Sequence, residues 1–182
     1  SSMAWAMKRD GLGGEIVGYA RSEETRQTAL KLGFVDQIAA TAKDAVKDAD
    51  LVVLCVPVGV MGAVAAEIGP YLKAGTTVTD VGSVKAAVIE AVSPHIPENV
   101  HFIPSHPLAG TEHSGPSSGF ASLFENRWWL VVPTENSDAE ATQKLVSLLQ
   151  AIGANVETMD AEHHDLTLAV TSHAPHLIAY TM

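Results

Sequence analysis

Short apolar segments alternate with segments of helical pattern along most of this chain, and this alternation most strongly limits what it can fold into. The clearest apolar segment is DLVVLCVP at 50–57, and TTVTDVG at 76–82 follows it after the helical pattern of 60–72. Strands that are apolar on both faces are typical of a parallel sheet covered by helices. The sequence therefore predicts a doubly wound α/β fold with a mostly parallel sheet.

The same alternation extends toward both ends of the chain. Ser22 is expected to cap a helix over 22–33, because acidic residues follow it and the segment closes on a glycine. Further helices are expected at 1–9, 42–49, 83–92 and 138–153 and from Ala161 onward, and further strands at 15–20, 99–105, 127–133 and 155–159. Since the chain begins and stops within helices, we expect a first strand with its glycine turn before Ser1 and more helix after Met182.

Charge and composition favour a small-molecule partner. The chain has 21 acidic against 11 basic residues, a formal net charge of −10, and no basic run. Nucleic-acid phosphates and anionic membrane surfaces repel such a chain, so we expect neither as a partner. The apolar runs have the length of strands and no signal peptide opens the sequence, which favours a cytoplasmic protein without a membrane span. The single cysteine, Cys55, is expected to be a buried hydrophobe within its strand.

Three unusual loops are expected at the carboxyl ends of strands, where parallel sheets bind ligands. They are CVPVGV after 50–57, DVGSVK after 76–82 and HPLAGTEHSG after 99–105, and we expect them to meet in one cleft. In the first loop, Val56 and Pro57 end the strand and allow the next helix to start close to a flat ligand. An ordinary strand-to-helix turn explains the same residues equally well.

The other two loops hold the candidate catalytic residues. Ser83 follows a glycine and is predicted to be the N-cap of the next helix, with its hydroxyl near the cleft. His106 stands in the loop behind a strand, and an imidazole there can take a proton from a substrate hydroxyl near neutral pH. Glu112 is suited to orient a histidine or to gate the cleft, although a solvated carboxylate is an equally good interpretation. For His113 the sequence favours a surface residue without a role.

The segment GYARSEE, at the end of the expected strand 15–20, bears on the choice of cofactor. In dinucleotide-binding sheets an acidic residue here binds the ribose 2′-hydroxyl, and an arginine can instead receive a 2′-phosphate. The chain has Arg21 and Ser22 at this point, with Glu23 and Glu24 only where the helix starts. This pattern favours NADP, or the use of both NAD and NADP.

A cluster of metal-ligating residue types near the end of the chain raises the possibility of a metal site. Its members are His163, His164, Asp165, His173 and His176. Zinc needs three or four converging ligands, and these spacings match no strong zinc signature. We therefore expect no metal.

Taken together, these segments resemble the prephenate and arogenate (cyclohexadienyl) dehydrogenases of tyrosine biosynthesis. The resemblance covers nearly the whole chain in order, from the amphipathic first helix through the segments GYARSEETRQTALKLGFVD, DLVVLCVPVGVM, TDVGSVK, HPLAGTEHSG and SHAPH. Each motif alone is modest, but HPLAGTEHSG together with DVGSVK and SHAPH is highly specific.

The resemblance implies an NAD- or NADP-dependent oxidative decarboxylation of prephenate, arogenate or both. Residues 1–160 would form a Rossmann-like dinucleotide-binding domain that lacks its first strand and glycine-rich turn. Residues 161–182 would be the start of a helical domain that forms a homodimer and completes the substrate site. The activity is thus expected of the parent protein.

The resemblance also implies roles for individual side chains. His106 would accept the hydrogen bond and then the proton of the ring hydroxyl, and Ser83 would hold the two groups in register. Glu112 resembles a gating or orienting carboxylate, and His176 resembles a substrate contact. The cofactor would lie against Arg21, Ser22, Val56, Pro57 and Ser83.

Three alternatives remain open at this point. A related β-hydroxy acid dehydrogenase would handle the proton with a lysine, and Lys85 is available. A nucleotide-binding module without catalysis would share the fold, because a fold does not dictate a function. A metal hydrolase would use the histidines near the end of the chain.

Overall fold

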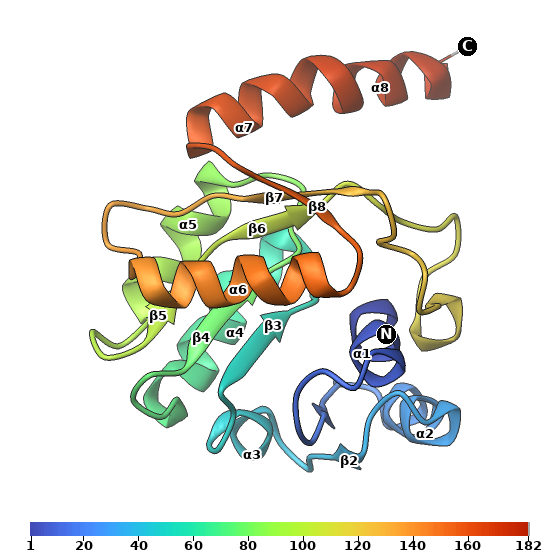
Figure 1. Cartoon of the computed structure of the whole chain (residues 1–182), viewed down its shortest axis with the longest axis vertical. Helices are drawn as coiled ribbons and strands as arrows, with labels where there is room; N and C mark the ends of the chain where they lie inside the picture. The colour runs from blue at the N-terminus through green and yellow to red at the C-terminus, as the bar shows by residue number, and fades with distance from the viewer. Residues whose placement is uncertain (182) are drawn as a thin grey trace.

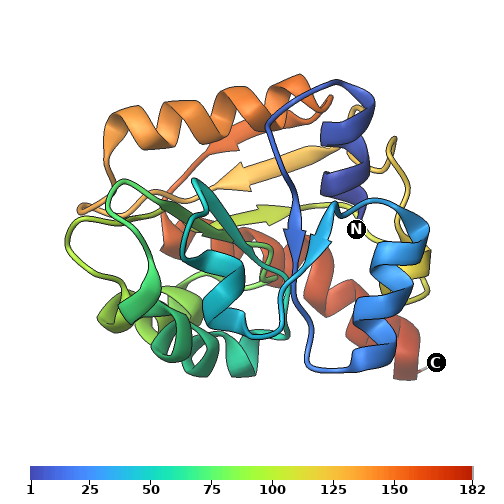
Figure 2. The same cartoon turned by 90° about the horizontal axis from the view of Figure 1, so that it is seen from below.

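The computed structural model describes residues 1–181, without the side chains of His176 and Tyr180, and strands and helices alternate along it (Figure 1). The strands are β1 (Val17–Gly18), β2 (Gln37–Ile38), β3 (Leu51–Leu54), β4 (Thr77–Asp80), β5 (His101–Phe102), β6 (Ser105–Pro107), β7 (Trp128–Val131) and β8 (Asn155–Thr158). The α-helices are α1 (Ser2–Arg9), α2 (Glu23–Leu32), α3 (Ala42–Val46), α4 (Val58–Ile68), α5 (Ala86–Val92), α6 (Ala139–Ala151), α7 (Ala161–Leu168) and α8 (Ala174–Thr181). The strands lie between helical layers (Figure 2), so the doubly wound α/β fold is confirmed.

The strands pair mostly in parallel, as the sequence predicts. β3, β4 and β5 form one parallel group, in which Leu54 pairs with Asp80, and β1 and β2 form a separate parallel pair. β7 pairs with β8 in parallel and with β6 in the antiparallel direction. Because β3 and β4 are parallel and in register, their carboxyl ends lie side by side at one edge.

The strand expected over 99–105 is in fact two strands that change partners at Pro104. β5 pairs with β4, whereas β6 pairs with β7. Pro104 has no N–H to continue the ladder, and the next N–H, of Ser105, donates to the Asp80 carboxylate at 3.1 Å. His106 therefore lies within β6, and the expectation that it stands in the following loop is wrong.

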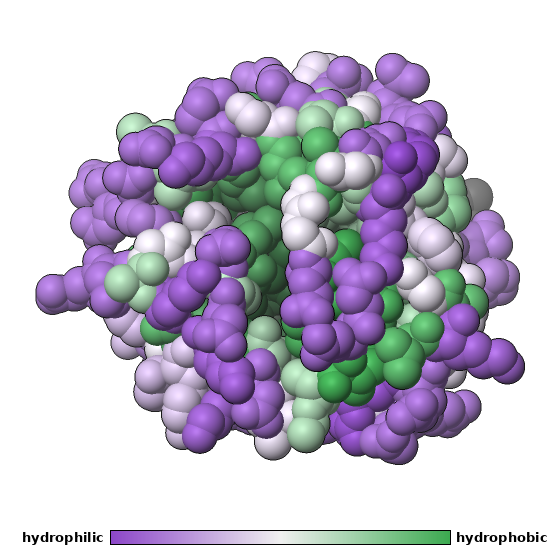
Figure 3. All heavy atoms as spheres, turned by 60° about the horizontal axis from the view of Figure 1, so that its bottom comes forward, coloured by the Kyte–Doolittle hydropathy of each residue, from purple (hydrophilic) through white to green (hydrophobic). Residues whose placement is uncertain are grey.

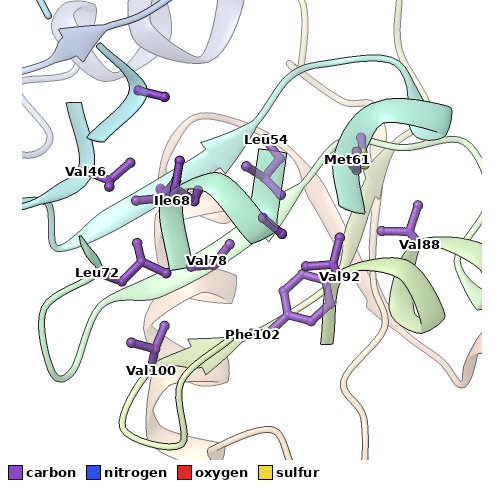
Figure 4. Packing of buried hydrophobic residues seen from close by; sticks show 13 residues of the cluster. Val46, Leu54, Met61, Ile68, Leu72, Val78, Val88, Val92, Val100 and Phe102 are labelled. Carbon is purple, nitrogen blue, oxygen red and sulfur yellow. The ribbon is translucent and has the colours of Figure 1, made fainter. Parts of the chain in front are cut away.

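Three apolar cores hold the layers together: one on each face of the strands, and a smaller one around Phe34 that joins α1 and α2. On one face, α3, α4 and α5 pack on β3, β4 and β5, and Met61, Val78 and Val88 are fully buried (Figure 4). On the other face, α1 and α6 pack on β6, β7 and β8 around Trp129 and Leu149. Each such side chain stabilises the fold by about 1.5–3 kcal/mol, so the strands that position the site are firmly held.

The helix expected from Ala161 onward forms as α7 and α8, joined by a π-helical turn at Ala169–His173. The wider turn lets the Ala174 N–H donate to the carbonyl of Ala169, so the chain stays helical as it reaches Pro175. Within residues 1–181, no helix combines the length and the hydropathy that are needed to cross a membrane.

Candidate active site

Loops from neighbouring strands meet at the carboxyl edge of β3 and β4. A Cβ on Gly82, which follows β4, would lie 3.2 Å from Val58 at the start of α4, so these two loops pack together. The hydrogen bond from Ser105 to Asp80 brings the start of β6 to the same place. The loops after β3 and β4 and the first residues of β6 therefore lie close together. Gly110, Thr111 and His113, further along the third loop, line a pocket with Ser1 and Ser2 instead, so a single cleft formed by all three loops stays a prediction. Cys55 is exposed at the edge of β3 and β4, and its expected burial is wrong because β3 ends one residue earlier.

His106 lies at this edge in contact with a second histidine. The residue is 9% exposed, and its Nδ1 lies 3.0 Å from Nε2 of His164. His164, on α7, is fully buried and places its own Nδ1 2.7 Å from Oδ1 of Asp165. Among the side chains that the structure describes, which exclude those of His176 and Tyr180, His106 forms a hydrogen bond only through Nδ1. Nε2 is then left for a ligand. The sequence singled out His164 and Asp165 only as weak metal ligands.

The surroundings of His106 keep its ring neutral. Burial lowers the pKa of His106 from 6.5 to about 4, and the nearby His164, Lys85 and His173 further oppose a positive charge. Burial also lowers the pKa of His164, although Asp165 acts in the opposite direction. At neutral pH both imidazoles are uncharged, so each ring has one nitrogen that donates a hydrogen bond and one that accepts.

Lys85 lies beneath this edge in a buried polar network. Its side chain is fully buried, and Nζ forms an ion pair with Asp80 and donates to the carbonyl of Ser105 at 2.7 Å. Asp80 also accepts the backbone N–H groups of Gly82 and Ser105. A lysine held in this way does not reach a ligand at the surface, and the structure therefore disfavours the lysine-based alternative.

Ser83 is exposed in the loop after β4, but it is not the N-cap that the sequence predicts. α5 begins at Ala86, and the Asp165 carboxylate accepts the N–H groups of Lys85 and Ala86 at 2.7 and 2.9 Å. These hydrogen bonds outweigh the burial of the carboxyl group and hold the pKa of Asp165 below its usual value. The start of α5 is thus capped by α7, which leaves the Ser83 hydroxyl without a capping role.

The residues expected to contact the cofactor lie at three strand ends, and those other than Ser83 follow β1 and β3. Ser22 caps α2 as expected, since its hydroxyl accepts the N–H of Thr25 at 3.4 Å. Arg21, just before it, is exposed. Pro57 is the N-cap of α4, and the half-buried Val56 precedes it at the end of the β3 loop.

Of the two other residues expected to contact substrate, the structure describes the side chain of Glu112 only, and no contact joins it to His106. Glu112 is exposed in the loop that follows β6. The side chain of His176 lies outside the described residues. Among the residues that the structure describes, no three His, Cys, Asp or Glu side chains gather closely enough to hold a metal ion.

Comparison with known proteins identifies the family. Residues 3–158 match the family described as prephenate dehydrogenase, nucleotide-binding domain. The chain is 44% identical over 164 residues to a cyclohexadienyl dehydrogenase from Zymomonas mobilis, an alignment that covers 90% of this chain and 56% of the relative. A structure of prephenate dehydrogenase from Aquifex aeolicus, in complex with hydroxyphenyl propionate and NAD+, matches with a TM-score of 0.91 and 31% identity, covering 99% of this chain and 63% of that one.

An arogenate dehydrogenase from Synechocystis has a similar structure, with a TM-score of 0.87 and 30% identity, and the match covers 96% of this chain and 60% of that one. The chain thus spans about half the length of the curated relatives that it matches. Because the family match extends over residues 3–158 and identity to a relative reaches 44%, the chain belongs to the prephenate dehydrogenase family through its nucleotide-binding domain.

Proposed function

We propose that the protein containing this chain catalyses the NAD- or NADP-dependent oxidative decarboxylation of prephenate, arogenate or both. The observation that carries the proposal is the neutral His106 at the ligand-binding edge of the sheet. Its Nε2 forms no hydrogen bond with any side chain that the structure describes. A neutral imidazole with a free ring nitrogen is the form that accepts a proton from a hydroxyl. Membership of the family supports the substrate class.

In the proposed reaction, Nε2 of His106 accepts the hydrogen bond of the ring hydroxyl and takes its proton as the hydroxyl becomes a carbonyl. The Ser83 hydroxyl, exposed in the neighbouring loop, binds the oxygen of the ring hydroxyl and keeps it aligned with the His106 imidazole. When bound, NAD or NADP takes up the hydride from the ring carbon that bears the hydroxyl. The C–C bond to the ring carboxylate breaks and carbon dioxide leaves. The electron pair of that bond moves through the ring to the carbonyl oxygen, which takes a proton back from His106 and becomes the phenol hydroxyl. Aromatisation drives the step, so the protein mainly positions the reactants and accepts and returns one proton.

Two further residues complete the proposed substrate site. Glu112, in the loop after β6, gates the site or orients the substrate, and its exposed position is compatible with movement on binding. His176, on α8, contacts the substrate from the helical side. Both roles rest on the resemblance of HPLAGTEHSG and SHAPH to the family motifs.

The end of β1 fits a dinucleotide cofactor. Arg21 is exposed there, whereas Arg26 is engaged by Glu23 and by the carbonyl of Ala20. Glu23 is itself held by Arg26 and by Gln27, whose amide donates to it at 2.8 Å. Arg21 is thus left as an exposed positive charge beside the proposed ribose position, which suits a 2′-phosphate, although Glu24 in the first turn of α2 is exposed as well. Ser22, Val56, Pro57 and Ser83 complete the proposed contacts.

Replacing Arg21 with Gln is expected to raise the KM for NADP by about tenfold to a hundredfold, because one charged contact to the 2′-phosphate is worth about 1.5–3 kcal/mol. The KM for NAD, which lacks that phosphate, should stay within about twofold of the unchanged enzyme. Initial rates at saturating substrate measure both constants. Equal effects on the two cofactors would remove Arg21 from the proposed 2′-phosphate site.

The proposed activity is tested with two substrates against two cofactors. Purified full-length protein is expected to reduce NAD or NADP, seen as absorbance of the reduced cofactor, with prephenate or arogenate. Stoichiometric hydroxyphenylpyruvate from prephenate, or tyrosine from arogenate, should form at the same rate. Cofactor binding without turnover in all four combinations would favour a nucleotide-binding module without catalysis. The same four rates identify the preferred substrate and cofactor.

We also propose the two-domain organisation, with a dinucleotide-binding domain over 1–160 and the start of a helical domain over 161–182. α7, α8 and the π-helical turn between them run along the edge of the molecule (Figure 1), and four of their apolar side chains are 59% or more exposed. They are Leu166, Val170, Leu177 and Ile178. Further helices and a second subunit would cover them, which supports a homodimer. A cytoplasmic location completes the proposal, because a biosynthetic dehydrogenase uses the soluble cofactor pool.

The proposed first strand would fit between β1 and β3. In the described residues β1 pairs only with β2 and β3 only with β4, and Val17 on β1 is 39% exposed. The space-filling view shows an apolar hollow between hydrophilic ridges (Figure 3). A strand that precedes Ser1 would join the two parallel groups into one sheet, with its glycine turn leading into α1.

A further inference from the structure

We propose that Asp165 and His164 act as positioning residues that fix His106 in the tautomer with a proton on Nδ1 and a free lone pair on Nε2. The three side chains form a hydrogen-bonded triad, from Asp165 through His164 to His106. The inference deepens the proposed function, because it explains which ring nitrogen of His106 can take the substrate proton. It concerns the direction of each hydrogen bond in the triad.

The carboxylate of Asp165 sets the direction at one end of the triad. It accepts the N–H groups of Lys85 and Ala86, at 2.7 and 2.9 Å, and an ionised carboxylate can only accept. These two bonds also hold the carboxylate in its ionised form. The hydrogen between Asp165 and His164, whose Nδ1 lies 2.7 Å away, must therefore belong to Nδ1 of His164.

The protonation of His164 then determines which ring donates in its hydrogen bond with His106. A neutral His164 with its proton on Nδ1 has a lone pair on Nε2, which lies 3.0 Å from Nδ1 of His106. Only a donor on His106 makes a hydrogen bond with that lone pair. His106 must therefore carry its proton on Nδ1, and its Nε2 is left as the acceptor.

The reverse arrangement is much less stable. If His106 carried its proton on Nε2, Nε2 of His164 would have to donate, and Nδ1 of His164 would turn a lone pair toward the Asp165 carboxylate at 2.7 Å. The structure would lose a hydrogen bond to a charged group and leave two acceptors facing each other, one of them the lone pair of the buried His164 ring. Since His164 is fully buried, water cannot replace the lost donor.

The charged groups around the triad also disfavour a doubly protonated ring. Lys85 faces the two histidines from the start of α5, and His173 faces His106 from the π-helical turn. Asp80 and Asp165 act in the opposite direction, but Asp80 is already paired with Lys85. The triad is therefore a chain of two neutral rings that ends in one carboxylate.

The triad joins two parts of the fold. Asp165 and His164 belong to α7, which leaves the sheet after β8, whereas His106 belongs to β6 (Figure 1). By accepting the first N–H groups of α5, the Asp165 carboxylate is held at a fixed place relative to β4 and β6. The tautomer of His106 is thus set by the docking of α7 on the sheet.

The tautomer can be observed directly in the full-length protein with 15N-labelled histidine. Protonated and unprotonated ring nitrogens give well-separated 15N signals, and a His106→Asn variant assigns the signals of that ring. We expect a protonated Nδ1 and an unprotonated Nε2 on His106. The opposite tautomer, or an equal mixture, would overturn the proposal. This measurement needs no turnover, so it stands apart from the failure or success of the proposed activity.

Two substitutions at His164 separate positioning from packing. His164→Leu removes the nitrogen that accepts from His106. We expect kcat to fall by about tenfold to a hundredfold while KM stays within about threefold, because a catalytic histidine in the wrong tautomer loses its basic nitrogen. His164→Gln places a side-chain amide where Nε2 of His164 lies, and its oxygen can accept from Nδ1 of His106. This variant should therefore keep most of the original kcat and the original His106 ring signals. The matched control is His163→Leu on the exposed neighbour of the same helix, for which we expect no change.

The outcomes separate the inference from the proposed function. A Gln variant that is no better than the Leu variant, or a Leu variant with unchanged kcat and unchanged His106 signals, would refute the positioning role. An unaltered protein that turns over neither prephenate nor arogenate would refute the proposed function, while the ring signals would still decide the tautomer.

Discussion

Replacing His106 with Asn is expected to lower the turnover of the full-length enzyme by about two to four orders of magnitude, the usual contribution of a general base. The side-chain amide of Asn can occupy the place of Nδ1 and still donate to His164, so the buried hydrogen bond is retained. The change removes the free nitrogen Nε2 and little else. The initial rate of cofactor reduction, at saturating prephenate or arogenate, measures the effect.

The matched control for this substitution is His95→Asn, on an exposed histidine that follows the C-terminal end of α5. Its turnover should stay within about twofold of the unchanged enzyme, and both variants should keep the thermal unfolding midpoint to within a few degrees. A His106→Asn enzyme that retains a third or more of its turnover would eliminate His106 as the base.

The order of helices and strands could be predicted from the sequence, because each element depends on a pattern of residues within its own segment. The helix over 22–33 has its cap at Ser22 and its terminal glycine in the chain itself, and α2 forms between them. The apolar run at 50–57 needs only burial on two faces, and it forms β3. Such features depend on neighbours within one turn or one strand, which a linear pattern records.

The details of the candidate site depend on contacts between distant segments. Ser83 has the residue type and place of an N-cap, but Asp165, from α7, supplies the acceptor for the first N–H groups of α5. His106 was found by its residue type, yet its burial depends on the pairing of β6 with β7. The partnership with His164 depends on where α7 docks, and no spacing along the chain predicts it.

The burial of Lys85 also depends on contacts between distant segments and could not be predicted from the sequence. By residue type it was a candidate for proton transfer, whereas the structure buries it completely against Asp80.

Lys85→Met is expected to lower the free energy of unfolding by about 3–5 kcal/mol, because it leaves the Asp80 carboxylate buried without its counter-charge. Urea unfolding, followed by the fluorescence of the buried Trp129 and the other tryptophans, measures the change.

A second substitution distinguishes lost pairing from lost packing in this variant. Adding Asp80→Asn to Lys85→Met removes the unpaired charge while an amide oxygen still accepts the N–H of Ser105 or Gly82, so part of the lost stability should return. Lys144→Met is the matched control. The Lys144–Glu140 pair is more than 70% exposed on both sides, so solvent screens it and its loss should leave the urea midpoint almost unchanged. A loss at Lys85 as small as that at Lys144 would mean that water reaches Asp80, and that the network beneath His106 does not hold β6 in place.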